Sequence, residues 1–309
     1  MAKDFYVQPD AADPVLDSAT VLAIVRRHAP GAAAVTAVDE SGGEARTYAI
    51  DDDLVLKVQR PQQLRARTSL AKERFFLDRL AGVAGVRVPS VIAGGTAETG
   101  IAYTLMSRLP GMALVAAGLG DGPRRHVLFE LGRMLRRIHG IPQQPLFDAR
   151  VIPGDHTPTD VRWRFGSLFD EAVALAVRAS VRWPAALEPQ PLARQAMRAL
   201  PDVDTFAALH SNPGAEHAFV DAHGGQLTGL IDFGDAYFSH PVHDLRRFRC
   251  PADRAALYEG YVADAAVSRN FEQTWRVACV LAALLAVAQN PECRAAALDE
   301  LSALVEHLR

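Results

Sequence analysis

Candidate chemistry in this sequence concentrates in one stretch, from residue 209 to residue 235. A polar loop carries His210, Asn212 and His217, and a later acidic loop carries Asp232 at the start of an Asp-Phe-Gly sequence. Two short apolar runs separated by a Gly-Gly turn lie between the loops and predict a β-hairpin. A hairpin would bring the loop ends together, where an imidazole, an amide and a carboxylate could orient a hydroxyl group and hold a divalent metal ion against nucleotide phosphates.

The spacing of these residues is similar to that of the protein kinases, which carry His-x-Asp-x-x-x-x-Asn and then Asp-Phe-Gly. Here His210 is followed two residues later by Asn212, and His217 comes five residues after Asn212. The frame is therefore kept, but two residues differ. Asn212 stands where the catalytic aspartate would be, and His217 stands where the metal-binding asparagine would be.

A strand lysine and a helix glutamate form a second candidate site. The only lysines of this arginine-rich chain are Lys3, Lys57 and Lys72, and Lys57 lies in the apolar run Leu-Val-Leu-Lys-Val, where a buried ammonium needs a partner. Glu73 follows in a helix predicted over residues 63–81. Such a pair holds the α- and β-phosphates in kinases. The alternatives are an edge-strand lysine that reaches solvent and an ordinary surface glutamate.

Two further stretches could contact a nucleotide. Gly42-Gly43 joins two predicted strands, and its backbone amides could lie over phosphates, although a plain hairpin turn explains the same pair. Met106 and Arg108 lie at the end of a strand predicted over residues 102–106, where backbone groups could meet an adenine ring. We expect Lys57 and Asp232 to face each other across a cleft, with a gap between them wide enough for a triphosphate.

The elements that position these residues change along the chain. Residues 1–106 are rich in predicted strands and residues 107–309 in predicted helices, so we expect a nucleotide-binding N-lobe and a C-lobe with the catalytic loop and a helical acceptor site. The predicted strands cover residues 35–38, 47–50, 54–58, 88–94 and 102–106. The predicted helices cover residues 18–29, 63–81, 123–140, 161–183, 254–266, 272–289 and 294–308, with a shorter one ending at 200 and a loop over 143–160.

Composition narrows the class of protein. The 309 residues carry a net charge of −3, which gives no support for a nucleic-acid partner. The most apolar run, residues 277–288, is too short to cross a bilayer, and the N-terminus lacks a signal-peptide core. Three scattered cysteines, Cys250, Cys279 and Cys293, predict buried thiols in a reducing compartment and no disulfide. We therefore expect a cytoplasmic protein with no membrane partner.

Taken in order, these stretches resemble the aminoglycoside phosphotransferase family, which includes macrolide and choline kinases and is related to protein kinases. The matching stretches are residues 54–58, Glu73, 103–111, 131–139, 209–221, 227–235 and 240–245. The resemblance implies a two-lobed, protein-kinase-like α+β fold with a small, mainly-β N-lobe and a larger, mainly helical C-lobe. It implies transfer of the γ-phosphate of ATP or GTP to a hydroxyl of an antibiotic-like or other small molecule. It also implies that Lys57 and Glu73 hold the phosphates and that Asp232, with His217, holds Mg²⁺ or another divalent ion.

The polar loop departs from the family pattern His-Gly-Asp-x-x-x-x-Asn. Ser211 replaces glycine, Asn212 replaces aspartate and His217 replaces asparagine, the last as in macrolide kinases. An asparagine has nearly the shape of an aspartate but cannot take a proton, and a positioned base contributes about 10²–10⁴-fold to a rate. We expect a slow or inactive enzyme that still binds nucleotide. The alternatives are a catalytically inactive sensor or partner protein, and an engineered substitution that traps a bound state.

The remaining candidates have plainer interpretations. Glu216 is not expected to replace the missing base, Asp244 is expected to tie down a loop, and His240 and His243 are interpreted as surface or loop residues. His217 could bind metal or only hydrogen-bond its loop, and imidazole nitrogen suits softer ions than Mg²⁺. Six arginines against four acids between residues 160 and 200, with several aromatic residues, favour a larger, more apolar or anionic acceptor over an aminoglycoside; a solvated helix face explains them equally well.

Overall fold

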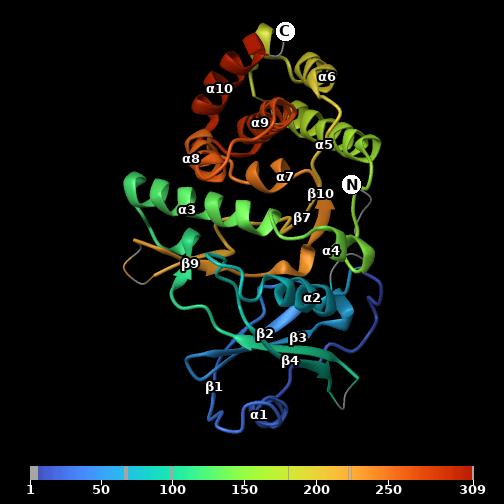
Figure 1. The fold of residues 1–309 in the computed structure, drawn as a ribbon, viewed down its shortest axis with the longest axis vertical. Helices are drawn as coiled ribbons and strands as arrows, with labels where there is room; N and C mark the ends of the chain where they lie inside the picture. The colour runs from blue at the N-terminus through green and yellow to red at the C-terminus, as the bar shows by residue number, and fades with distance from the viewer. Residues whose placement is uncertain are drawn as a thin grey trace.

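The computed structural model describes residues 6–65, 69–97, 100–179, 181–221, 223 and 225–307. An antiparallel sheet dominates its N-terminal region and helices dominate its C-terminal region, which confirms the predicted α+β architecture (Figure 1). The N-terminal region contains α1 (Ser18–Arg26), β1 (Val35–Asp39), β2 (Ala45–Ile50), β3 (Leu54–Gln59), η1 (Pro61–Gln63), α2 (Leu70–Leu80), β4 (Val91–Thr96) and β5 (Ala102–Ser107).

The C-terminal region begins with a short strand and is built on long helices. Its elements are β6 (Met112–Ala113), η2 (Leu114–Ala116), α3 (Asp121–His139), α4 (Gln144–Asp148), α5 (Pro158–Arg178), η3 (Ala185–Leu187), α6 (Pro189–Ala199), β7 (Ala207–Leu209), β8 (Ala218–Val220), β9 (Leu227–Leu230), η4 (Phe233–Asp235), β10 (Tyr237–Ser239), α7 (Val242–Leu245), α8 (Pro251–Val262), α9 (Arg269–Gln289) and α10 (Arg294–His307). The region predicted as a loop, residues 143–160, therefore contains α4 and the start of α5.

Strand β3 lies in the centre of the N-terminal sheet, whose order is β1-β2-β3-β5-β4. Lys57 pairs with Thr47 of β2 and Thr104 of β5, which excludes the edge-strand alternative. Successive side chains of a strand point to opposite faces of the sheet. Leu56 and Val58 therefore pack with α1 in a small core, and Lys57 points to the other face, toward α2.

Helix α2 carries the glutamate across that face. It begins at Leu70 and is capped by Ser69, so the predicted helix over residues 63–81 starts too early; part of that range lies outside the described residues. The apolar stripe of α2 is buried in the main core, and this places Glu73 inside the protein, with 1% of its surface exposed. The surface-charge alternative for Glu73 is therefore wrong.

Two small β-pairings position the polar and acidic loops. β8 and β9 form the predicted hairpin, with Ala218 opposite Leu230, while Gly224 of the predicted turn lies outside the described residues. β7 pairs with β10, with Leu209 opposite Tyr237. β7 leads into the polar loop and β9 leads into the acidic loop. Both strands lie between the long helices and the N-terminal sheet, and so do the loops that follow them (Figure 1).

The helices of the C-terminal region pack closely around one core. α3 and α8 approach so tightly that a Cβ on Gly132 would lie 2.0 Å from the Leu257 carbonyl oxygen, and one on Gly260 would lie 1.9 Å from that of Phe129. α9 has the length and hydropathy of a membrane span, but 67% of its apolar window is buried between other helices. It is therefore a core helix, as predicted for residues 277–288.

The cysteine prediction is partly wrong. Cys250 and Cys293 form a disulfide with their Cα atoms 5.3 Å apart, joining the start of α8 to the segment before α10, whereas Cys279 is a buried free thiol as predicted. The two partners are 43 residues apart in sequence, and only the packing of α8 against α10 brings them together. The cysteines thus give no argument for a reducing compartment.

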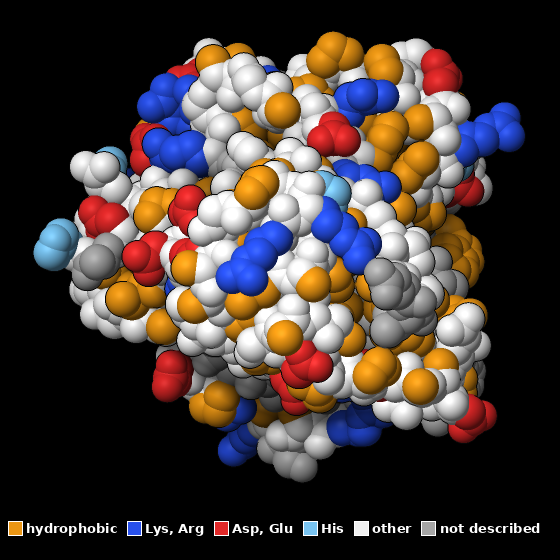
Figure 2. Space-filling model, turned by 90° about the horizontal axis from the view of Figure 1, so that it is seen from below, with side chains coloured by type: hydrophobic (Ala, Val, Ile, Leu, Met, Phe, Trp, Pro, Cys, Tyr) orange, Lys and Arg blue, Asp and Glu red, His pale blue; other side chains and the backbone are white. Residues whose placement is uncertain are grey.

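The surface below the sheet carries mixed side chains. Seen from below the view of Figure 1, acidic, basic and hydrophobic groups are interspersed over the visible described residues (Figure 2). This mixture matches the near-neutral net charge of −3.

Candidate active site

Lys57 joins the two regions of the protein. Its ammonium donates to Glu73 Oε1 and to Asp232 Oδ1, both at 2.8 Å. Only 2% of the Glu73 side chain is exposed, compared with 43% for Asp232. A strand, a helix and an acidic loop that are far apart in sequence thus meet at one ammonium group.

The charges of these three groups are mutually dependent. Burial alone would lower the pKa of Lys57, but Glu73 and Asp232 outweigh burial and raise it above its ordinary value. The Lys57 ammonium holds the pKa of Asp232 well below its usual range, whereas burial raises the pKa of Glu73 despite the same ammonium. Lys57 and Asp232 are therefore charged at neutral pH.

The expected triphosphate-wide gap between Lys57 and Asp232 is absent, because the two side chains are in direct contact. The facing arrangement is as expected, but the separation is wrong. An ammonium and a carboxylate in a partly buried cleft attract each other and close any space between them. A phosphate chain must therefore lie beside the pair, or separate it on binding.

Two adjoining cavities border this pair. One of 340 Å³ is lined by Gly42, Gly43 and His217, and one of 280 Å³ is lined by Met106 and Arg108. Both cavities are also lined by Lys57, Glu73 and Asp232. All the residues predicted to contact nucleotide and metal therefore line one continuous cleft.

The connecting strand offers fewer backbone groups than predicted. The Ser107 N–H donates to the Ser90 carbonyl at 2.9 Å, and the Arg108 N–H donates to the Asp53 carbonyl at 2.7 Å. These two donors are satisfied inside the protein. A purine in the 280 Å³ cavity would have to use other groups of this segment.

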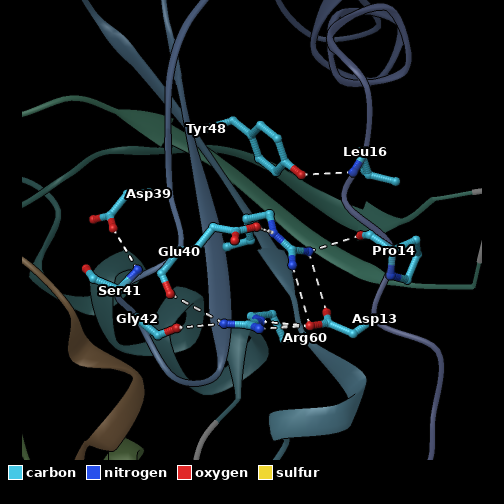
Figure 3. Close-up of polar contacts among 10 residues, drawn as sticks. Asp13, Pro14, Leu16, Asp39, Glu40, Ser41, Gly42, Tyr48 and Arg60 are labelled. Atoms are coloured by element: carbon cyan, nitrogen blue, oxygen red, sulfur yellow. Dashed lines mark hydrogen bonds and ion pairs between the residues drawn. The ribbon is translucent and has the colours of Figure 1, made fainter.

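An arginine network holds the glycine loop between β1 and β2. Arg60 donates to the carbonyl oxygens of Glu40 and Gly42, each at 3.4 Å, and to Asp13 Oδ2 at 2.9 and 3.0 Å (Figure 3). Arg46 links Asp13 to the Glu40 carboxylate. The loop that could cover phosphates is thus fixed to the segment that precedes α1.

The polar loop is fixed by one buried carboxylate. Asp244 accepts from the backbone N–H groups of His210 and Ser211 at 2.9 and 2.8 Å, and from His139 Nε2 at 3.1 Å. Its expected role in tying down a loop is confirmed. Burial raises the pKa of Asp244, but the hydrogen bonds that it accepts from His139 and from the His210 backbone outweigh burial and lower it. Ser211 adopts a left-handed φ of +74°, which explains why a glycine suits this position.

Both ring nitrogens of His210, a catalytic candidate from the sequence, make hydrogen-bond contacts with the backbone. Its Nε2 lies 2.7 Å from the Ile231 carbonyl oxygen, and its Nδ1 accepts the Asn212 N–H at 3.2 Å. Burial lowers the pKa of His210 to about 4, so the ring is neutral at pH 7. It links the polar loop to the strand that leads to Asp232.

Asn212 and His217 line different cavities. Arg247 Nη2 donates to Asn212 Oδ1 at 2.5 Å, and Asn212 lines a third cavity, which Lys72 and Asp235 also line, next in the chain to residues of the cleft. His217 lines the cleft: its Nδ1 lies 2.7 Å from the Asn212 carbonyl oxygen and its Nε2 lies 3.4 Å from Asp232 Oδ2. Glu216 also lines the cleft, whereas Asn212 does not.

Two side chains of the cleft, those of Asp232 and His217, could bind a divalent ion. If His217 Nδ1 donates to the backbone, its Nε2 lone pair faces the same space as Asp232 Oδ2. No group of three or more candidate ligands gathers among the described residues. Mg²⁺ commonly takes one or two protein ligands and completes its shell with water and phosphate oxygens, so two ligands suffice.

Several residues of the site escaped the sequence prediction. His240 and His243, interpreted as surface or loop residues, are buried. Arg246, Arg247 and Asp155 line or support the third cavity, and only their positions relative to the loop in space reveal it. The nearest signal in the sequence was the run Arg246-Arg247, next to a stretch already matched to the family.

Comparison with known proteins shows which family this chain is similar to. The family model described as "Phosphotransferase enzyme family" matches residues 35–286. The chain belongs to the phosphotransferase enzyme family. The resemblance to the aminoglycoside phosphotransferase family that the sequence indicates is thereby confirmed. The family match covers most of both regions.

Solved structures of family members share the fold. The GDP complex of aminoglycoside 2′-phosphotransferase-IIIa has a TM-score of 0.59 at 16% identity, covering 94% of this chain and 99% of that one. Macrolide 2′-phosphotransferase MphH from Brachybacterium faecium has a TM-score of 0.56 at 19% identity, with 92% and 97% covered. A streptomycin–ATP complex of APH(2″)-IIa has a TM-score of 0.54 at 14% identity, with 94% and 97% covered. The protein-kinase-like fold is therefore confirmed.

Proposed function

We propose that this protein binds ATP or GTP in the cleft and transfers the γ-phosphate, slowly, to a hydroxyl group of a small molecule. The observation that carries the proposal is the double ion pair of Lys57 with Glu73 and Asp232, at the wall shared by the two cleft cavities. The GDP and ATP complexes of structural neighbours support a nucleotide in such a cleft. We place the boundary between the lobes after residue 106.

Each charged group then has a role in binding. Lys57 binds the α- and β-phosphates and Glu73 orients its ammonium, while Asp232 and His217 hold the divalent ion. When bound, such an ion neutralises the charge on the phosphate oxygens. Met106 and Arg108 border the base, and the Gly42-Gly43 loop covers the phosphates.

Asn212 positions the acceptor without acting as a base. Arg247 has only donors, so it fixes the Asn212 amide with Oδ1 toward the guanidinium and leaves Nδ2 to donate to the acceptor oxygen. That oxygen attacks the γ-phosphorus, the bond to the bridging oxygen breaks and the nucleoside diphosphate leaves. The hydroxyl proton passes to water or a phosphate oxygen, because an amide cannot accept it.

The same residue favours a second candidate function. An asparagine engaged by Arg247 at 2.5 Å lacks the proton acceptor of the family pattern, while Lys57, Glu73 and Asp232 are kept. This combination suits a catalytically inactive protein that binds nucleotide or a small ligand as a sensor or partner. Binding and turnover must therefore be measured separately.

A direct test compares wild type, Lys57→Met and Asn212→Asp. Calorimetry with ATP and with GTP, each with Mg²⁺, should show binding by wild type and by Asn212→Asp, and at least about tenfold weaker binding by Lys57→Met. Restoring a base should raise phosphate release by about 10²-fold or more. Binding without that gain would favour the inactive alternative. Failure of wild type to bind either nucleotide would exclude the phosphotransferase and leave, of the inactive alternative, only the form that binds a small ligand.

A further inference from the structure

The polar loop forms part of the wall of the third cavity, which meets the cleft region where Lys72 and Asp235 line the cavity and Glu73 and Gly234 line the cleft. The cavity has a volume of about 250 Å³, and Ser211 and Asn212 form part of its wall, whereas His217 and Asp232 line the cleft. If nucleotide occupies the cleft, this cavity is the place from which an acceptor reaches Asn212. This placement of the acceptor rests on the proposed function.

The walls of this cavity are strongly basic. Its basic residues are Arg65, Lys72, Arg164, Arg246 and Arg247, and the acid that lines it with them is Asp235. Two of the arginines are compensated: Arg65 pairs with Glu44 at 3.2 Å and Arg164 with Asp155 at 2.6 Å. Within the described part of the chain, Arg246 and Arg247 make no ion pair with a carboxylate.

Arg246 is held in place by a neutral group. Its Nε donates to His243 Nδ1 at 3.3 Å, and the His243 ring packs at a tilt of 34° against Phe165, with ring centroids 4.7 Å apart. Burial, followed by the nearby Arg247, Arg249 and Arg164, lowers the pKa of Arg246 to about 9. These guanidinium groups repel one another, and an anion between them would relieve the repulsion.

Arg164 is also fixed in position. Asp155 accepts from Arg164 Nε and Nη2 and from the hydroxyls of Tyr237 and Ser239, at 2.6 to 3.1 Å. The Arg164 guanidinium also lies over the Tyr237 ring, 4.0 Å from its centroid. A guanidinium fixed in this way is preorganised to form paired hydrogen bonds with a phosphate or carboxylate.

We propose that the acceptor of this protein is a small hydroxylated molecule that carries a phosphate group, bound by Arg246 and Arg247 beside Asn212. The anionic group anchors the molecule, and a hydroxyl of the same molecule reaches the Asn212 amide. A polycationic aminoglycoside would be repelled by these arginines. The basic walls of the cavity also disfavour the larger apolar acceptor considered from the sequence.

The test compares four probes by calorimetry: a hexose phosphate, the same hexose without phosphate, kanamycin and inorganic phosphate. Wild type should bind the hexose phosphate at least about tenfold more tightly than inorganic phosphate, and the affinity should fall as salt is raised. Arg246→Gln and the exposed Arg247→Gln should each weaken hexose phosphate binding by about ten- to hundredfold. Arg178→Gln, an exposed arginine of α5 that lines none of the three cavities, should leave it unchanged.

Nucleotide affinity in the same variants separates this proposal from the proposed function. Arg247→Gln should bind ATP or GTP like wild type, since Arg247 lines the third cavity and neither cavity of the cleft. Equal affinity for inorganic phosphate and hexose phosphate, tighter binding of kanamycin, or loss of nucleotide affinity in Arg247→Gln would overturn the anionic acceptor. Hexose phosphate binding by a protein that binds no nucleotide would overturn the proposed function and keep the anion site.

Discussion

At the scale of single residues, the polar loop combines a strained position with a missing base. Ser211 takes a φ of +74° where the family pattern has glycine, and a left-handed conformation costs a residue with a Cβ about 1–2 kcal/mol. Ser211→Gly removes that cost but adds freedom to the unfolded chain, which offsets about 0.5–1 kcal/mol. We expect Ser211→Gly to raise the free energy of unfolding by up to about 1.5 kcal/mol, measured by urea denaturation.

A matched variant identifies the cause of that gain. Ser211→Ala removes the hydroxyl but keeps the Cβ, so the backbone strain remains and no stabilisation is expected. If Ser211→Ala stabilises the protein as much as Ser211→Gly, the hydroxyl and not the backbone is responsible. The Asp244 contacts to this loop use backbone N–H groups and survive both substitutions.

At the scale of elements, the glycine loop depends on a residue far from it in sequence. Asp13 pairs with Arg60 at 2.9 Å, and Arg60 in turn donates to the loop carbonyls of Glu40 and Gly42. Asp13→Asn should loosen the loop and weaken nucleotide binding by about three- to tenfold, because a hydrogen bond to a charged group is worth about 1.5–3 kcal/mol and only part of that loss reaches the ligand. Calorimetry with ATP and GTP measures the effect.

The exposed Asp10 provides the control for this element, since it precedes Asp13 in the same segment. Asp10→Asn should leave nucleotide affinity unchanged. Equal effects of the two substitutions would mean that the overall charge of the segment, and not the Asp13–Arg60 contact, acts on the nucleotide. Unchanged affinity in Asp13→Asn would show that the loop is held without this ion pair.

At the scale of the whole molecule, the sequence predicts those contacts whose residues stand at a characteristic spacing along the chain. Lys57 in an apolar run, Glu73 on the next helix and the hairpin before Asp232 were enough to predict which residues meet. The disulfide, the close α3–α8 contact and the basic cavity depend on segments joined only by tertiary packing, so periodicity gave no sign of them. The direct Lys57–Asp232 contact was missed because motif spacing carries no information on distance across a cleft.

Buried histidines should make the folded state sensitive to acid. Burial lowers the pKa of His240 to about 3 and that of His243 well below its ordinary value. Asp204 and His139 act on His240, and Arg164, Arg246, Arg247 and His240 act on His243. Because both folded-state values lie below the unfolded value of about 6.5, the unfolded chain binds more protons in between, and the free energy of unfolding falls as the pH falls below about 6.5.

His240 should contribute a loss of about 1.4 kcal/mol per pH unit between about pH 6 and pH 4, and His243 should add a loss in the same direction. In wild type, His240 Nδ1 accepts a hydrogen bond from the Val242 N–H at 3.3 Å, and the amide oxygen of His240→Asn can accept it instead. This variant should lose the contribution of His240 to the dependence of unfolding free energy on pH. Urea denaturation at several pH values measures the difference in unfolding free energy between wild type and His240→Asn. The titration of the carboxylates is common to both proteins and cancels in this difference. His126→Asn, at an exposed position of α3, should keep the wild-type slope. Parallel curves for wild type and His240→Asn would show that His240 gains its proton without unfolding.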